Sequence, residues 1–283
     1  MEIQKVGIVG AGVMGSGIAQ AFALAGIEAV ITDVSENALR RGLETISGSM
    51  DRMIKKEKIT AEQKTRALAA ITAERDVQAV AGCELVIEAA TENEGLKLDI
   101  FRQLDAVVRP DAIIASNTSS LSITRLAAAT RRPGQVIGLH FFNPVPMMAL
   151  VEIISGLQTS AETVAAAERL AQRIGKTPVK VRNGPGFVVN RLLCPMINEA
   201  VFALGEGLAT AAEIDEAMKL GANHPIGPLA LGDLIGLDVE LAIMQVLFEG
   251  FKDPKYRPAP LLVEMVEAGY LGRKTGRGFF SYT

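Results

Sequence analysis

Cysteine and histidine are scarce in this sequence. Two cysteines, Cys83 and Cys194, occur in 283 residues, and neither stands in a Cys-x-x-Cys pair or beside a histidine. This pattern argues against a zinc site and against a disulfide framework, so we expect both thiols to be small buried groups in a reducing compartment. Because there are only two histidines, few side chains can titrate near neutral pH.

The sequence also lacks an excess of one charge and any long apolar run. Its formal net charge is -3, from 29 basic and 32 acidic residues, which gives no general attraction for nucleic acid. No apolar stretch is long enough to span a membrane, and a strand-like segment follows Met1 where a signal peptide would have its basic head and apolar core. We therefore expect a cytoplasmic protein that binds neither nucleic acid nor membranes.

The length and composition favour two domains. With 283 residues, of which 49% are hydrophobic, the chain can bury a large core, and one large α/β domain is the alternative. The cluster Asn183-Gly184-Pro185-Gly186 contains strong helix and strand breakers. We therefore predict a first domain of residues 1–183 and a second of residues 184–283.

The first domain alternates short apolar runs with helical stretches. Such runs are typical of strands covered by helices on both faces, so the pattern predicts a doubly wound, mostly parallel Rossmann-type sheet of the α/β class. Two further strands are expected after the prolines that follow residue 143, with a helix over 161–174 between them. The predicted strands are 5–9, 29–34, 84–90, 112–116, 136–141, 149–154 and 178–181.

One connection is too long for an ordinary crossover. Residues 35 to about 73 are helical in character, and we predict a pair of helices that stands off the sheet. Basic residues gather near its tip, where a solvated helix face is the alternative to a ligand contact. They are Arg52, Lys55, Lys56 and Lys58.

The second domain is predicted to be all helical. Helices are expected over 187–204, 211–220, 229–251 and 260–268, separated by glycine and proline. Their apolar content exceeds what so short a domain can bury alone, which predicts a subunit interface here, in a homodimer.

A glycine-rich loop follows the first strand. Residues 10–15 fit Gly-x-Gly-x-x-Gly, a weak motif by itself, but here it follows a strand and opens a helix over 16–24. In that context the glycines allow the tight turn, the approach of pyrophosphate and close helix packing, with the helix N-terminus facing the phosphates. We predict a dinucleotide site that includes Gly10, Gly12, Val13, Met14 and Gly15.

Asp33 lies at the end of the second predicted strand, where a carboxylate accepts hydrogen bonds from the adenine ribose hydroxyls. It would repel a 2′-phosphate, so NAD is favoured over NADP. A cap of the following helix is the alternative role for Asp33.

His140 is the better of the two candidate bases. It ends a strand on the side of the sheet where ligands bind, whereas His224 lies in a loop before Pro225. His140 and Glu152 are symmetric about Pro146, so an antiparallel turn would make them cross-strand neighbours. A carboxylate there would fix the imidazole tautomer and raise its basicity, although a purely structural His–Glu pair is the alternative.

Several motifs together resemble the 3-hydroxyacyl-CoA dehydrogenase family, in order along nearly the whole chain. They are the glycine loop, Ser116-Asn117-Thr118-Ser119-Ser120, His140-Phe141-Phe142-Asn143-Pro144, Glu152, Gly184-Pro185-Gly186-Phe187-Val188-Val189-Asn190-Arg191 and Gly272-Arg273-Lys274-Thr275-Gly276.

The resemblance implies a role for each catalytic residue. His140 takes the proton of the 3-hydroxyl group and Glu152 orients the imidazole, while Ser119 and Asn190 hydrogen-bond the substrate oxygen. These types suit hydride transfer, which needs a placed base and neutral donors for the new carbonyl. Without the resemblance, Ser119 could be a helix N-cap and Asn190 an ordinary polar helix residue.

The resemblance also implies ligand contacts. Glu92, Lys97, Asn143 and Lys274 would lie toward NAD, and Ser49 and Lys56 would contact coenzyme A. An acyl-CoA thioester is thus the expected substrate, and its anionic nucleotide part would contact the basic tip of the helical excursion. No hydratase-like segment accompanies the motifs, which favours the short-chain members and hence 3-hydroxybutyryl-CoA and acetoacetyl-CoA.

Other functions stay open at this point. A sugar-acid dehydrogenase of the gulonate type would keep the glycine loop and the His140–Glu152 pair but needs no coenzyme A contacts. A β-hydroxyacid dehydrogenase with a lysine base fits less well, because the candidate base is a histidine between two strands. A protein that binds NAD without turnover would not need Ser119, His140, Glu152 and Asn190 to converge.

Overall fold

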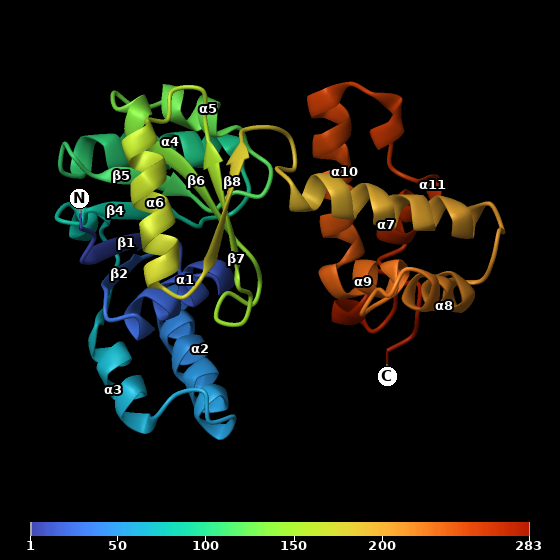
Figure 1. Ribbon diagram of the computed structural model, residues 1–283, viewed down its shortest axis with the longest axis horizontal. Helices are drawn as coiled ribbons and strands as arrows, with labels where there is room; N and C mark the ends of the chain where they lie inside the picture. Colours follow the sequence, from blue (N-terminus) through green and yellow to red (C-terminus); the bar gives the residue numbers. More distant parts are fainter. Residues whose placement is uncertain (1, 283) are drawn as a thin grey trace. The chain divides into compact units, whose positions relative to one another are not determined.

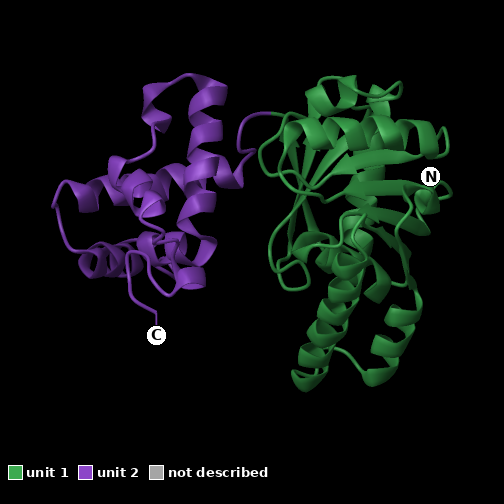
Figure 2. Cartoon of the chain, turned by 180° about the vertical axis from the view of Figure 1, so that it is seen from behind, with its two compact units in different colours: residues 1–183 green, residues 184–283 purple. Residues whose placement is uncertain are grey.

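The structure, a computed structural model, describes residues 2–282. The chain forms two compact units, unit 1 up to Asn183 and unit 2 from Gly184 (Figure 2). Each unit contains its own clusters of buried apolar side chains. Each is therefore described by itself.

Unit 1 is built around one sheet, which has eight strands within residues 2–282 (Figure 1). The strand order is β3-β2-β1-β4-β5-β6-β7-β8, and neighbours are parallel except β6 and β7, which are antiparallel. The order reverses between β1 and β4, and such a switch point marks the ligand crevice in open α/β sheets. The strands are β1 (Lys5–Val9), β2 (Glu28–Thr32), β3 (Ile71–Glu74), β4 (Leu85–Glu88), β5 (Ile113–Ser116), β6 (Val136–Phe141), β7 (Leu150–Ser155) and β8 (Thr177–Arg182).

The predicted doubly wound sheet is confirmed, and β1 and β6 have the predicted bounds. The prediction that the helical excursion continues to about residue 73 is wrong at its end, because residues 71–74 form β3. Ile71 and Thr72 are β-branched, and they pair with Ala29 and Val30 of β2. Pairing with the free edge of β2 gives this segment its structure, although the sequence before it is helical.

Helices cover both faces of the sheet. Buried residues of α1 and α6 share one apolar cluster with alternate residues of the strands, so these two helices cover one face. On the other face, α4 packs against α5, and Ile123 of α5 lies over Gly138 of β6. The helices are α1 (Val13–Leu24), α4 (Glu94–Val107), α5 (Ile123–Ala128) and α6 (Ala161–Arg173), with short 3-10 helices at Val77–Val80 and Pro133–Gln135.

The predicted helical pair is confirmed as α2 (Glu36–Lys55) and α3 (Ala61–Ala69), which project from the sheet in Figure 1. The Ser35 side chain caps α2 by accepting from the Ala38 N–H, and Thr60 and Gln63 form a capping box at α3. Both helices pack against α1, with Ile46 and Met50 of α2 fully buried.

Unit 2 consists of helices. The helix predicted over 229–251 is wrong as one element, because Gly236, with φ of +105°, ends α9 and begins α10. A β-carbon at Gly236 would lie 3.0 Å from Lys274 Nζ, and L-residues rarely adopt this φ. The helices are α7 (Val189–Gly205), α8 (Ala211–Gly221), α9 (Pro228–Ile235), α10 (Leu237–Phe251) and α11 (Pro260–Glu267), with 3-10 turns at Pro254–Tyr256 and Arg273–Thr275. Within residues 2–282 we find no helix with the length and apolarity needed to cross a membrane.

Candidate active site

The glycine loop between β1 and α1 has a backbone that other residues could not form. A β-carbon on Gly10 would lie 2.6 Å from the Ala89 carbonyl oxygen, and one on Gly15 would lie 1.8 Å from the Gly10 carbonyl oxygen. Among residues 2–282, no atom beyond Gly12 and its two chain neighbours lies within 4 Å of a β-carbon placed on Gly12, and no side chain caps the start of α1. The first N–H groups of α1 are therefore available to an anion, as a bound pyrophosphate requires.

Asp33 connects the end of β2 to this loop. Its Oδ2 accepts a hydrogen bond from the Ala11 N–H at 2.9 Å, and its Oδ1 accepts one from the Ser35 N–H at 2.9 Å. Ser35, not Asp33, is the N-cap of α2. Asp33 is only half-buried, so its carboxylate can also accept hydrogen bonds from ribose hydroxyls.

Strand alternation places four polar side chains on one face of the sheet. Glu88 and Ser116 are register partners at the ends of β4 and β5, and His140 and Glu152 are register partners on β6 and β7. This is the face opposite α1 and α6, because the strand neighbours of the four residues belong to the core beneath those helices: Ile87, Ala115, Leu139, Phe141, Val151 and Ile153. The ends of the parallel strands β4, β5 and β6 and the beginning of the antiparallel strand β7 thus bring these side chains to one edge.

His140 and Glu152 form a buried pair, as the symmetry about Pro146 predicts. His140 Nδ1 lies 2.7 Å from Glu152 Oε2, and the two side chains are 7% and 0% exposed. The Phe142 ring packs on the imidazole at 4.4 Å between centroids. A buried carboxylate at Nδ1 holds the ring and favours the tautomer that carries its proton on Nδ1, which makes Nε2 the acceptor nitrogen.

Glu92 accepts hydrogen bonds from the loop that follows β5. Its Oε1 accepts hydrogen bonds from the Thr118 and Ser120 hydroxyls and, at 3.0 Å, from the Ser119 N–H. Burial alone would raise the pKa of Glu92, but the Lys97 ammonium and these hydroxyl groups outweigh it and hold that pKa below its usual value. Glu92 is therefore ionised at neutral pH, with 37% of its side chain exposed.

The remaining predicted site residues of unit 1 lie on other segments. Asn143 is exposed, just after β6, in a cis peptide bond with Pro144. Ser49 lies half-buried on α2, and Lys56 is the exposed C-cap of that helix, beside the other basic residues of the tip. Their contacts with ligands stay predictions.

Two predicted residues belong to unit 2. Asn190 is buried in the first turn of α7. Lys274 lies in the turn Arg273–Thr275, where its ammonium pairs with Asp238. Burial would raise the pKa of Asp238, and the hydrogen bond from Lys274 outweighs it, so that the pKa is lowered. Their predicted roles toward substrate and NAD stay predictions.

Sequence reasoning missed two polar residues of this edge, Glu88 and Ser116. Glu88 is 0% exposed and accepts hydrogen bonds from Lys97 Nζ at 2.7 Å and from Ser116 Oγ at 2.6 Å. The sequence does contain a signal for Glu88, because a carboxylate at the end of an otherwise apolar strand must find a partner when it is buried.

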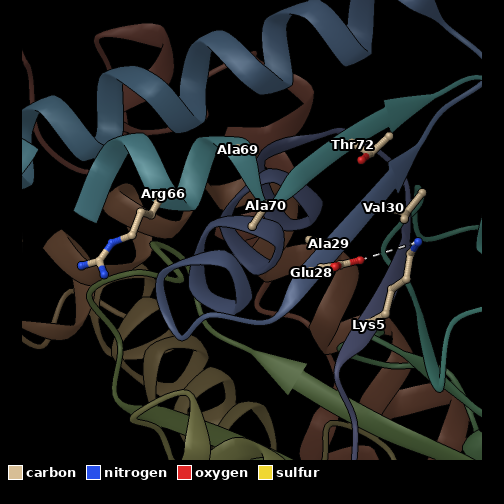
Figure 3. A pocket seen from close by; sticks show the side chains of 8 residues that line it. All are labelled: Lys5, Glu28, Ala29, Val30, Arg66, Ala69, Ala70 and Thr72. Atoms are coloured by element: carbon tan, nitrogen blue, oxygen red, sulfur yellow. Dashed lines mark ion pairs between the residues drawn. The ribbon is translucent and has the colours of Figure 1, made fainter. Parts of the chain in front are cut away.

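A hollow of about 440 Å³ lies at the opposite edge of the sheet (Figure 3). Lys5 and Glu28, the first residues of β1 and β2, line it, together with Arg66 of α3. Ligands of doubly wound sheets bind beyond the carboxyl ends of the strands, whereas these are amino ends. The hollow contains none of the predicted site residues, so we assign the site to the glycine loop edge.

Family models match both units. Residues 5–184 match the model described as "3-hydroxyacyl-CoA dehydrogenase, NAD binding domain", and residues 186–282 match the C-terminal domain of the same family. The chain belongs to the 3-hydroxyacyl-CoA dehydrogenase family. The resemblance drawn from the motifs is thereby confirmed, and so are the α/β fold class and NAD as the cofactor.

Relatives of this dehydrogenase match over nearly their whole length. A 3-hydroxybutyryl-CoA dehydrogenase of Bradyrhizobium diazoefficiens is 54% identical over 280 residues, covering 99% of this chain and 96% of the relative. A probable 3-hydroxybutyryl-CoA dehydrogenase of Bacillus subtilis is 50% identical over 282 residues, covering 100% of this chain and 98% of the relative. The crystal structure of an (S)-3-hydroxybutyryl-CoA dehydrogenase from Ralstonia eutropha has a TM-score of 0.97 and 60% identity, with 100% of both chains covered.

Proposed function

We propose that this NAD-dependent dehydrogenase interconverts (S)-3-hydroxybutyryl-CoA and acetoacetyl-CoA, with His140 as the general base. The observation that carries the proposal is the buried His140–Glu152 pair, 2.7 Å apart, at the cofactor edge of the sheet. The names of the relatives favour this substrate, since three of them at 50–60% identity act on 3-hydroxybutyryl-CoA by their descriptions.

Each residue has a defined task in the oxidation. The hydroxyl proton passes to His140 Nε2, which is the acceptor nitrogen of the ring because Nδ1 donates to Glu152. NAD, when bound, accepts the hydride that leaves C3, and the C3–O bond becomes a carbonyl. Glu152 stabilises the imidazolium that forms, and Ser119 donates a hydrogen bond to the developing carbonyl oxygen. In the reverse direction His140 returns the proton.

The basic tip of α2 supports a coenzyme A thioester. Lys55, Lys56 and Lys58 are exposed there, and a surface of this charge suits the phosphates of coenzyme A. A gulonate-type substrate has no phosphate groups with which these charges could pair. Asn190 stays a predicted substrate contact, as the family resemblance implies.

We also propose that the chain forms a homodimer through unit 2. Several leucines of this unit are exposed, and contact with a second copy of the unit would remove them from water. They are Leu192, Leu208, Leu220 and Leu234. Light scattering after size-exclusion chromatography should give twice the 30.0 kDa mass of one chain. The mass of a single chain would contradict the dimer.

The substrate is tested by initial rates of NADH oxidation with a series of 3-ketoacyl-CoA thioesters, alongside NAD reduction with L-gulonate. We expect the highest kcat/KM with acetoacetyl-CoA and a decline as the acyl chain lengthens. Turnover of L-gulonate without turnover of acetoacetyl-CoA would contradict the proposal. NADH binding without turnover of any of them would indicate a binding protein.

A further inference from the structure

Lys97 of α4 is a buried cation between two carboxylates. Its Nζ lies 2.7 Å from Glu88 Oε1 and 3.2 Å from Glu92 Oε2, and it donates to the Ala90 carbonyl oxygen at 3.3 Å. The side chain of Lys97 is 1% exposed and that of Glu88 is 0% exposed. A buried ammonium without such partners would be strongly destabilising, so the three charges hold one another in a fixed arrangement.

The arrangement is anchored in the sheet at its Glu88 end. Glu88 is the last residue of β4, at the switch point, and its Oε1 also accepts from the Ala90 N–H at 2.7 Å. Its Oε2 accepts from Ser116 Oγ at 2.6 Å, on the last residue of β5. The Glu88 carboxylate is therefore carried by the last residue of β4 and bonded to the last residue of β5, and buried strands are among the least mobile parts of a domain.

At its other end the arrangement holds the loop of Ser119. Three donors converge on Glu92 Oε1: the hydroxyls of Thr118 and Ser120, and the backbone N–H of Ser119. An ionised carboxylate only accepts, and its hydrogen bonds are stronger than those of a neutral carboxyl group, so the ionised form suits three converging donors. The charge of Lys97, next to Glu92, favours the ionised form.

We propose that Glu88 and Lys97 are positioning residues of the reaction, which hold the Glu92 carboxylate so that it sets the position of Ser119. Neither residue needs to touch substrate, because each acts through Glu92. The inference rests on the role given to Ser119 in the proposed function. A plain structural role, in which the ion pair only fastens α4 to β4, would affect stability and leave the Ser119 loop unchanged.

The first test measures backbone hydrogen exchange of residues 117–121 in the full chain without cofactor. Glu88→Gln removes the anchoring charge, and the double variant Glu88→Gln with Lys97→Met neutralises the pair without leaving a lone buried charge. We expect both to speed exchange in this segment roughly tenfold, because an opened hydrogen bond exposes the amide. Exchange at the wild-type rate would overturn the proposal.

Asp105→Asn is the matched control for that test. Asp105 is also a buried carboxylate, on the same helix α4, paired with Arg132 at 2.8 Å and Arg131 at 3.1 Å. We expect it to lower the melting temperature while exchange in residues 117–121 stays at the wild-type rate. Faster exchange of this segment in the control would assign the effect to general loosening and overturn the proposal.

The second test is a double-mutant cycle between Glu88→Gln and Glu92→Gln in acetoacetyl-CoA reduction. We expect Glu88→Gln to lower kcat/KM roughly tenfold in the wild-type background, since small misplacements of a reacting group have effects of this size or more. In the Glu92→Gln background it should have no further effect, because Glu88 acts through Glu92. Full additivity of the two effects would overturn the proposal.

Failure of a variant to fold and failure of the proposed function can each be distinguished from failure of this positioning proposal. If Glu88→Gln does not fold, Ser116→Ala removes the hydrogen bond to Glu88 Oε2. Because Ser116 Oγ also accepts from the Thr118 N–H, exchange is then read at the Ser119 amide, which donates to Glu92 and should exchange faster by a smaller factor. Exchange of this amide at the wild-type rate would overturn the proposal. If the wild-type protein does not reduce acetoacetyl-CoA, the proposed function fails, whereas the exchange measurement still decides whether Glu88 and Lys97 order the Ser119 loop.

Discussion

Unit 1 and unit 2 both bury carboxylates, but they satisfy them differently. In unit 1, Glu88 and Glu152 are 0% exposed, and each lies 2.7 Å from a basic nitrogen, of Lys97 and His140 respectively. In unit 2, Glu240 of α10 is also 0% exposed, yet neither of its oxygens has a hydrogen-bond partner within residues 2–282. The nearby polar group is the thiol of Cys194, which is itself buried.

Other buried acids of unit 2 are satisfied. Asp215 accepts from the N–H groups of Leu229 and Ala230 at the start of α9, and Asp233 accepts from the Tyr282 hydroxyl at 2.9 Å. Glu240 therefore differs from its neighbours and from the acids of the site. Burial raises its pKa to about 8, and the nearby Cys194 thiol opposes that rise. A paired acid keeps its charge and fixes its partner, whereas an unpaired one takes up a proton.

His140→Ala removes the basic partner of a paired acid, Glu152, and should have the largest effect. We expect kcat for acetoacetyl-CoA reduction to fall about 10²–10⁴-fold, as is typical when a general base is removed. The dissociation constant for NADH, measured by fluorescence, should change little, because the glycine loop is untouched. Turnover near the wild-type rate would rule out His140 as the base.

Glu152→Gln weakens the pair without removing the base. It keeps the side chain's shape but withdraws the charge that stabilises the imidazolium, so kcat should fall less than in His140→Ala, by roughly 10–100-fold. The ratio of the two kcat values checks this order. A larger loss in a well-folded Glu152→Gln protein would mean that the two roles are exchanged.

Glu240→Gln tests the unpaired side through the pH dependence of stability. The folded protein binds a proton at Glu240 that the unfolded chain has lost, so the wild-type contribution to stability is present near pH 4.5 and is lost as pH rises to about 8. The slope is up to about 1.4 kcal/mol per pH unit. The melting temperature of Glu240→Gln relative to that of the wild type should therefore increase from pH 5 to pH 6.5 and again to pH 8, by an amount that corresponds to this slope.

Glu267→Gln is the control for that series, since Glu267 is exposed on α11 and the substitution is chemically the same. Its difference from wild type should stay constant with pH. A constant difference for Glu240→Gln as well would show that Glu240 finds a partner and remains charged.

Asp33→Ser sharpens the comparison at a half-buried carboxylate. The ratio of kcat/KM for NAD to that for NADP should fall roughly tenfold, because a hydrogen bond to a charged group contributes on the order of 1.5 kcal/mol and repulsion of a 2′-phosphate is also lost. Asp76→Ser, which alters another acid that accepts a backbone N–H, should leave the ratio unchanged. An unchanged ratio in Asp33→Ser would make Asp33 a structural residue.

Lys56→Ala tests an exposed charge, where the smallest effect is expected. KM for acetoacetyl-CoA should rise about fivefold with little change in kcat, since an exposed ion pair is worth on the order of 1 kcal/mol and lies far from C3. The pantetheine thioester, which lacks the nucleotide phosphates, should respond little, and Lys219→Ala in unit 2 should affect neither substrate. Equal effects on both substrates would make the tip a solvated helix face.

Local patterns in the sequence predict the parts of this fold that local chemistry determines. The glycine loop needs glycine at two crowded positions, and the symmetry about Pro146 predicts the His140–Glu152 register. What could not be predicted depends on distant segments. β3 forms because β2 has a free edge, and the break at Gly236 requires a positive φ beside Lys274.

The charge network of the site shows the same limit. Glu92 and Lys97 are identified by family resemblance, but nothing in their spacing indicates that Lys97 is buried against Glu88 or that Glu92 collects three donors from the Ser119 loop. Those contacts arise where β4 and β5 end side by side. Glu240 likewise gives no local sign that it is buried without a partner, because the same helix α10 also carries Glu249, which is exposed.

A crystal structure with NAD and acetoacetyl-CoA bound would test the central claim most directly, namely that His140 exchanges the proton of the substrate oxygen at C3. The account predicts the 3-keto oxygen about 2.6–3.2 Å from His140 Nε2, the range that direct proton transfer requires, with Glu152 still at Nδ1 and Ser119 at the same oxygen. A keto oxygen bound away from the imidazole, with another titratable side chain beside it, would contradict the account.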